Sequence, residues 1–260
     1  MLSKQTFSLK ALLIFTTLVC FVLWLSGRDN YYFNYLEKRA LDKLWEEANP
    51  KGVNISTFSE GISFDVRDTS KKKQGAVAID LSGVDWTHRV KNIHVSYLTT
   101  KSADRLPDLR LVGINKIQNF EKLTIRCDLP ELESAWRVFS QFKGDLRIKS
   151  FELDFMPYWI ESKQLFSPEA KEALASLKNL EHLKTTVCSN DIDVLRELKN
   201  LKSLTLTGGG INSNIFEHVE GLNNLEALEI SILRNSDITQ EMLDDFQEKM
   251  PDLKITAYFL

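Results

Sequence analysis

Cysteine is scarce in this chain of 260 residues, which has only three. Cys20 lies inside an apolar run, so Cys127 and Cys188 are left for the folded part. Both follow segments expected to be strands two strand spacings apart, which would separate them by roughly 10 Å, beyond the disulfide reach of about 7 Å. We therefore expect two buried thiols with no disulfide between them, as in a bacterial envelope protein rather than a secreted disulfide scaffold.

An excess of charge of either sign is also missing. The sequence has 33 basic and 36 acidic residues, a net charge of −3, and neither half is conspicuously basic. Nucleic acid is therefore not an expected partner. The basic run Lys71-Lys72-Lys73 is typical of a solvated loop.

The motifs of metal and nucleophilic chemistry are missing as well. The four histidines, at positions 88, 94, 182 and 218, have no metal-ligand spacing, and no H-E-x-x-H, C-x-x-C or Walker-type motif occurs. Ser70 and Lys73 form S-x-x-K, but they lie in the lysine-rich stretch without the partner motifs of serine acyl-enzymes. The glycines at 208–210 are interpreted as a backbone turn after a strand. We predict no catalytic residue, no metal and no cofactor.

Leucine, in contrast, recurs at regular intervals in the C-terminal half. The pattern L-x-x-L-x-x-L-x-L occurs at Leu198, Leu201, Leu204 and Leu206 and again, 24 residues later, at Leu222, Leu225, Leu228 and Ile230. A fixed period of this size predicts stacked units, each a strand followed by a helix. Each unit is too small to bury its own apolar side and therefore buries it against its neighbours.

One of these units resembles a leucine-rich repeat. Leu180, Leu183, Thr185 and Cys188 fit the motif L-x-x-L-x-L-x-x-N/C, with threonine in the last aliphatic position. The run Met250-Pro251-Asp252-Leu253-Lys254-Ile255 is similar to the closing repeat of bacterial leucine-rich-repeat proteins. The resemblance implies an α/β fold, a right-handed solenoid of parallel strands and helices, over residues 76–260.

The last aliphatic position of each unit predicts which residues of neighbouring strands lie opposite one another. The residues at this position are Ile125, Leu153, Thr185, Leu206, Ile230 and Ile255. Upstream, Ile93, Val95 and Tyr97 alternate as in a strand, and Leu106, Leu109 and Leu111 repeat the spacing of the ladder. Both upstream segments are therefore expected to be rungs of the same array.

The first 49 residues have the pattern of a membrane anchor and its flank. Residues 11–27 carry no charge and reach about 25 Å as a helix, within the accepted range for a span. Leu25 and Trp24 do not suit a cleavage site, which favours an uncleaved anchor over a cleaved signal peptide or a buried helix. We predict a cytoplasmic tail at 1–10, a transmembrane signal anchor at 11–27 and a juxtamembrane amphipathic helix at 28–49.

The orientation in the membrane and the segment after the anchor follow from weaker patterns. Basic residues flank the span on both sides, but the acid-free tail favours a single-pass protein whose repeats lie outside the cytoplasm. Residues 50–75 are expected to form a hairpin and linker, with strands around Ile55 and Phe64 on either side of Ser59-Glu60-Gly61. This hairpin would cap the exposed apolar end of the first repeat.

Residues that alternate with the ladder are expected to face outward on one concave sheet. The candidate binding residues there are Lys122, Arg126, Glu152, Asp154, His182, Lys184 and Glu229. The same face is also compatible with an ordinary solvated surface, because it lacks the aromatic anchors of binding hot spots. Tyr158 and Trp159, in the longest interval between rungs, are a candidate contact loop, unless they fold back to fill a gap between repeats.

These patterns together predict a membrane-anchored, non-catalytic leucine-rich-repeat scaffold that binds a protein or an envelope polymer. One alternative is an enzyme or enzyme subunit with a pocket between residues 53–97 and the first repeats. Another is a purely structural envelope protein. Acids, histidines or a nucleophile converging in one cleft would favour the enzyme.

Overall fold

The computed structural model describes residues 38–40, 42–49, 53–58, 61–66, 77–82, 90–97, 106, 108–117, 119–128, 132–156, 165–187, 191–208, 211–233 and 236–260. The chain divides into two compact units, residues 1–43 and 44–260. In the first unit, residues 38–40, 42 and 43 are described and are helical. The predicted tail at 1–10 and the predicted span at 11–27 lie outside the described residues. Within the described ranges, no helix is both long and apolar enough to cross a membrane.

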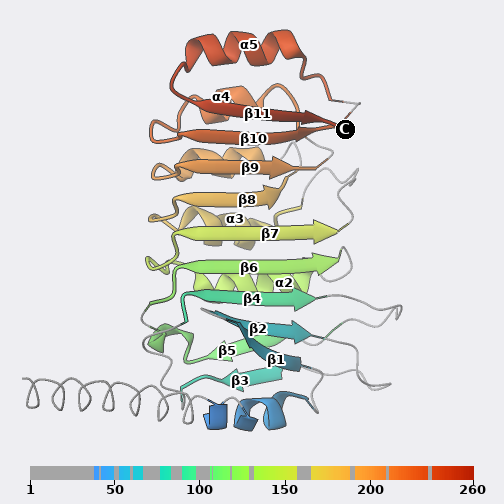
Figure 1. The fold of residues 1–260 in the computed structure, drawn as a ribbon, viewed down its shortest axis with the longest axis vertical. Helices are drawn as coiled ribbons and strands as arrows, with labels where there is room; N and C mark the ends of the chain where they lie inside the picture. Colours follow the sequence, from blue (N-terminus) through green and yellow to red (C-terminus); the bar gives the residue numbers. More distant parts are fainter. Residues whose placement is uncertain are drawn as a thin grey trace, which may run out of the picture. The chain divides into compact units, whose positions relative to one another are not determined.

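The second unit is mixed α and β and is built on one large sheet, the main sheet, with nine strands among the described residues. Its strands follow one another in chain order, and all neighbours are parallel except β1 and β2, which are antiparallel (Figure 1). The strands are β1 (Val53–Phe58), β2 (Gly61–Val66), β4 (Asn92–Tyr97), β6 (Lys122–Asp128), β7 (Ser150–Met156), β8 (His182–Thr186), β9 (Ser203–Thr207), β10 (Ala227–Ile232) and β11 (Lys254–Phe259).

The leucine ladder forms strands of the main sheet because alternate residues of a strand face the same side. Leu204 of β9 lies opposite Leu183 of β8 and Leu228 of β10, and all three side chains are buried. Thr185 occupies an aliphatic position of the ladder opposite Leu206, and it too is buried. The prediction that successive units cover one another's apolar side is therefore confirmed for these strands.

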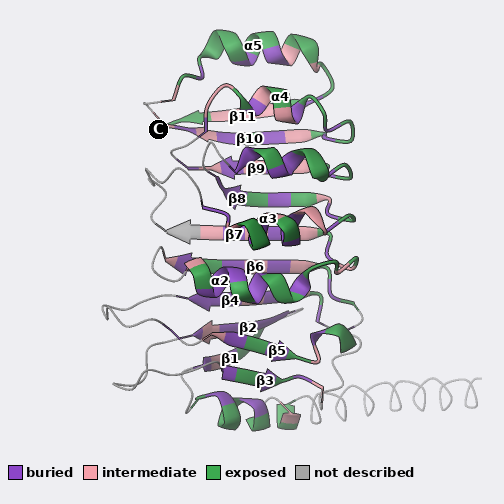
Figure 2. Cartoon of the chain, turned by 180° about the vertical axis from the view of Figure 1, so that it is seen from behind, coloured by how far each residue is buried: buried purple, intermediate pink, exposed green. Residues whose placement is uncertain are grey.

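Helices cover one face of the main sheet, and no described segment lies over the other (Figures 1 and 2). The helices are α2 (Leu132–Phe139), α3 (Pro168–Ala175) and α4 (Ile215–Val219), with 3-10 turns at Ile114–Lys116, Ser140–Phe142 and Ile192–Glu197. A further helix, α5 (Gln240–Lys249), lies past β11 at the end of the sheet in both views. Its Leu243 and Phe246 are buried, so it covers apolar surface at this end.

One predicted rung does not belong to the main sheet. β5 (Leu109–Val112), which contains Leu109 and Leu111, pairs in parallel with β3 (Val77–Asp80) in a second, smaller sheet. The backbone N–H of Leu109 donates a hydrogen bond of 3.2 Å to the hydroxyl of Tyr97, which ties this sheet to β4. The prediction failed because the same alternation of apolar residues suits a buried strand in either sheet.

The predicted hairpin is confirmed at the N-terminal end of the second unit. Ile55 of β1 lies opposite Phe64 of β2, and both are buried. β2 also pairs in parallel with β4, so the hairpin continues the main sheet. Residues 44–48 are helical, and their Leu44 and Ala48 are buried.

The alignment predicted for the closing unit is wrong by two residues. Ile255 was expected beside Ile230, but it lies opposite Leu228, and Ala257 lies opposite Ile230. A shift of two residues keeps every side chain on its own face, so apolar alternation cannot detect it. The shift brings Tyr258 opposite Ser231.

Gly208 ends β9 in a backbone conformation that favours glycine. Its φ is +122°, and a Cβ placed there would lie 2.8 Å from the carbonyl oxygen of Val187. The positive φ and the close approach explain why glycine stands at this position, directly after β9. Residues 209 and 210 lie outside the described ranges.

Candidate binding surface

The face of the main sheet that no described segment covers is called the open face. Parallel pairing without offsets puts one residue of each strand in line with one residue of the next. Residues of the open face are Ser63, Asp65, Asn92, His94, Ser96, Lys122, Thr124, Arg126, Asp128, Ser150, Glu152, Asp154, His182, Lys184, Thr186, Ser203, Thr205, Thr207, Ala227, Glu229, Ser231, Lys254, Thr256 and Tyr258. All seven predicted surface residues are therefore on one face.

Glu152 lies at the centre of an ion-paired group on this face. Its carboxylate is 3.0 Å from the ammonium of Lys122 on β6 and 2.9 Å from that of Lys184 on β8. Burial alone would raise the pKa of Glu152, but hydrogen bonds from Lys184 and Lys122 outweigh this effect and hold the pKa below its ordinary value. The carboxylate is consequently charged at neutral pH, and it connects three neighbouring strands.

A second ion pair lies beside the first. The Nε of Arg126 donates a hydrogen bond of 2.7 Å to Asp154, which lies opposite it on β7. The side chain of Asp154 is 13% exposed and that of Arg126 is 45% exposed. The arginine therefore keeps surface that an incoming partner can reach, whereas the aspartate acts mainly by orienting it.

His182 and Glu229, the other two predicted residues, lie apart from these ion pairs. Both are exposed, and His182 begins β8 opposite Ser150 and Ser203. Glu229 lies on β10 opposite Thr205 and Thr256. The structure thus brings together five of the seven predicted residues and places two at separate points of the same face.

Sequence reasoning missed His94 and Asp65, which extend the open face over β4 and β2. Burial lowers the pKa of His94 below its ordinary value, and Arg126 adds to this effect, whereas the carboxylates of Asp65, Glu152 and Asp154 oppose it. The imidazole is therefore mostly neutral at pH 7. The signal was present, because His94 alternates with buried Ile93 and Val95, but these strands were not included in the predicted surface.

Tyr258 is the second omission, and it corrects the statement that this face lacks an aromatic residue. It lies at the C-terminal end of the open face opposite Ser231, and it is 49% exposed. An exposed tyrosine offers an apolar ring and a hydroxyl at the same point, as binding hot spots require. Alternation along β11 already assigns it to this face, and the observed alignment with β10 sets its place opposite Ser231.

The remaining candidates are only partly covered by the structure. Tyr158, Trp159 and Cys188 lie outside the described residues. Cys127 is a buried thiol on β6. Over the described part of the chain, no three His, Cys, Asp or Glu side chains are grouped so that they could hold a metal ion.

No protein-family model, curated protein or solved structure matches this chain at a significant level.

Proposed function

We propose that the chain is a membrane-anchored protein of the leucine-rich-repeat type, which binds a protein partner on its open face and carries out no catalysis. In this proposal, residues 11–27 are an uncleaved signal anchor that crosses the membrane once. The strands and helices after residue 76 form a right-handed solenoid outside the cytoplasm. The protein thereby holds its partner close to the membrane.

The order of the strands supports the repeat type. From β7 onward, each strand of the main sheet pairs with the strand that directly precedes it in the chain, with helical segments between them. Crossover connections between parallel strands of one sheet are right-handed in nearly all proteins. Leu183, Leu204 and Leu228 share one position in three successive units, as stacked repeats require.

The alternation of charge across the open face is the observation that carries the binding proposal. Basic Lys122 and Arg126 on β6 are followed by acidic Glu152 and Asp154 on β7 and then by basic Lys184 on β8. A polyanion or polycation would meet a stripe of its own sign, whereas a folded protein can present both signs at matching positions. Such complementarity determines orientation and specificity more than affinity.

The C-terminal end of the open face, where Glu229 and Lys254 are the charged residues, supports a contact centre for the partner. Thr205 lies between Lys184 and Glu229 in the alignment of the strands, and Tyr258 lies on the edge strand. Aromatic residues surrounded by polar neighbours contribute much of the binding free energy at protein interfaces. We therefore expect the partner to cover the surface from Lys184 to Tyr258.

Photocrosslinking in intact cells tests this proposal. A photoreactive amino acid replaces Thr205 on the open face, and the same amino acid replaces exposed Glu248 on α5 as the control. We expect one discrete protein to be captured from position 205 and not from position 248. The substitution Tyr258→Ala should lower the captured amount by roughly fivefold or more, because hot-spot residues contribute over about 1 kcal/mol.

Capture of the same mixture of neighbours from both positions would contradict the binding proposal and favour a structural role.

The membrane orientation has its own test. A reporter that fluoresces only in the cytoplasm, fused after Leu260, should stay dark, and bright cells would contradict the proposed orientation.

A further inference from the structure

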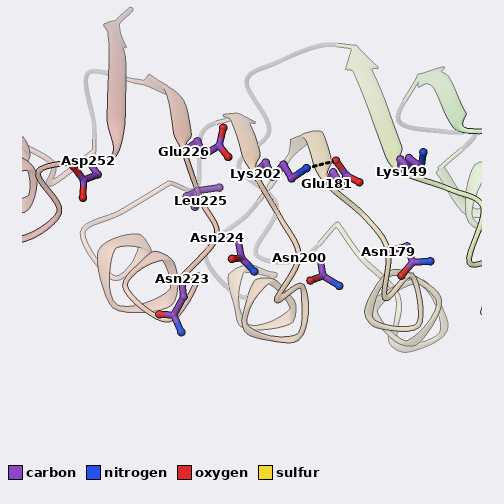
Figure 3. A pocket seen from close by; sticks show the side chains of 10 residues that line it. All are labelled: Lys149, Asn179, Glu181, Asn200, Lys202, Asn223, Asn224, Leu225, Glu226 and Asp252. Atoms are coloured by element: carbon purple, nitrogen blue, oxygen red, sulfur yellow. Dashed lines mark hydrogen bonds and ion pairs between the residues drawn. The ribbon is translucent and has the colours of Figure 1, made fainter.

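A groove runs along the edge of the main sheet at which β7 to β11 begin, separate from the open face. It has a cavity volume of about 680 Å³ and is lined by residues of five successive units, the last of which contributes Asp252. Two rows of polar side chains follow the groove, one of amides and one of alternating charge (Figure 3). Neither row was recognised from the sequence.

The amide row consists of Asn179, Asn200 and Asn224, each three residues before a strand. Each side-chain Nδ2 donates a hydrogen bond to a backbone carbonyl of the preceding unit, at 2.8, 2.7 and 2.8 Å respectively. None of their side-chain oxygens accepts a hydrogen bond from a described residue. Three successive units, those of β8, β9 and β10, therefore each hold one oriented amide with an available acceptor.

The charge row consists of Lys149, Glu181, Lys202 and Glu226, each directly before a strand. The backbone N–H of each of the last three donates to the carbonyl of the residue before it in this row, at 2.8, 2.7 and 2.8 Å. The ammonium of Lys202 lies 2.7 Å from the carboxylate of Glu181. The signs alternate along the row, so its two lysines and two glutamates balance.

We propose that this groove binds a linear, uncharged, hydroxyl-rich glycan, with one sugar ring beside each unit. A hydroxyl both donates and accepts hydrogen bonds, and so it suits an amide and a charged group at once. The charges of the row balance, and Asp252 leaves the groove with one excess negative charge, which disfavours a polyanion and is too little to select a polycation. The groove is thus a second binding site, independent of the partner proposed for the open face.

The spacing of the units favours a glycan over an extended peptide as the ligand of the groove. Neighbouring strands are about 4.8 Å apart, so amides and charges recur at that interval. Side chains on one side of an extended peptide recur at about 6.7 Å and fall out of step after one unit. One ring of an extended glycan covers close to one strand spacing and stays in step across all four units.

The affinity expected of this groove is low for each unit. The groove is lined by polar side chains and Leu225, without an aromatic ring on which a sugar could stack. A single exposed hydrogen bond contributes a factor of about five to an equilibrium constant. Four units in step should therefore give a dissociation constant on the order of millimolar for a tetrasaccharide.

Titration of the full-length protein in lipid nanodiscs tests the proposal, with cellotetraose as the probe and saturation-transfer NMR as the readout. Asn223 is exposed, lines the groove and makes no hydrogen bond to a described residue, so Asn223→Arg fills the groove without removing a contact. Asn214→Arg is the matched control, because Asn214 is equally exposed and lies beside α4. Asn223→Arg should raise the dissociation constant about fivefold or more, the effect of one lost hydrogen bond, and Asn214→Arg should leave it unchanged.

Three results would overturn the glycan site: no saturation of the unsubstituted protein by cellotetraose, an equal effect of both arginine substitutions, or saturation by the peptide hexaserine instead. Crosslinking from Thr205 should be unaffected by Asn223→Arg. A failure of the crosslinking experiment therefore bears on the open face alone, and a failure of the titration bears on the groove alone.

Discussion

Replacement of Leu204 by alanine tests the stacking of the units most directly. Leu204 is fully buried in the centre of β9 and lies opposite Leu183 and Leu228, which are themselves buried. Its side chain therefore contributes to the interfaces with both neighbouring units. In a stacked array, stability is approximately a sum of such nearest-neighbour interfaces.

The expected loss of unfolding free energy is about 3.5–4.5 kcal/mol. The three carbon groups removed are worth about 2.4 kcal/mol in transfer from water. The cavity that remains adds about 1–2 kcal/mol, because strands of a hydrogen-bonded sheet cannot close fully around it. Smaller losses would mean that neighbouring side chains relax into the space.

Urea unfolding of the full-length protein in nanodiscs, followed by far-ultraviolet circular dichroism, measures this loss. Leu146→Ala is the control, because Leu146 is 57% exposed and should change the unfolding free energy by less than about 0.5 kcal/mol. Equal midpoints for Leu204→Ala and the unsubstituted protein would refute the argument that this row of leucines is the shared interior of the units.

Two further predictions concern the turn after β9 and the charge at the centre of the open face. Gly208→Ala should lower the unfolding free energy by about 2–3 kcal/mol in urea titrations, because φ is positive and the new Cβ would meet Val187, whereas Gly144→Ala, with nothing within 4 Å, should cost about 1 kcal/mol. Equal costs would contradict the close approach. The pKa of Glu152 in the folded protein lies below the ordinary value of 4.5. The ion pairs of Glu152 therefore stabilise the folded protein fully above the ordinary pKa, and this stabilisation is lost as the pH falls through the pKa of the folded state. Glu152→Gln should therefore flatten the acid side of the stability profile, and parallel profiles would contradict the ion-paired arrangement.

The strands of the ladder could be predicted because their signal is local. Leu204 and Leu206 alternate with polar residues, and alternation alone tells which side chains of a strand face the interior. The hairpin around Ile55 and Phe64 was predicted for the same reason. Stacking in chain order followed from the fixed period of the units.

The composition of the open face could be predicted in part. Alternation identified Lys122, Glu152 and Lys184 as residues of one face. Their ion pairs could not be derived from the sequence, because they join residues about 30 positions apart whose approach depends on the length of each connection. Tyr258 was missed because the strand β11 was not included in the predicted surface, and the two polar rows of the groove were missed because they lie in turns outside the strands.

The alternation of apolar and polar residues within each segment was enough to establish which residues of the ladder are buried. The reason is that alternate side chains of a strand face opposite sides of the sheet, whichever strands lie beside it. Three matters required the folded chain: the membership of Leu109 in the small sheet, the two-residue displacement of Ile255, and the meeting of Arg126 with Asp154. Each of these features depends on contacts between segments that are distant in the sequence. Alternative sheets or alignments that keep the same alternation bury the same residues, so the sequence pattern does not distinguish them. Packing of whole units against one another selects between them.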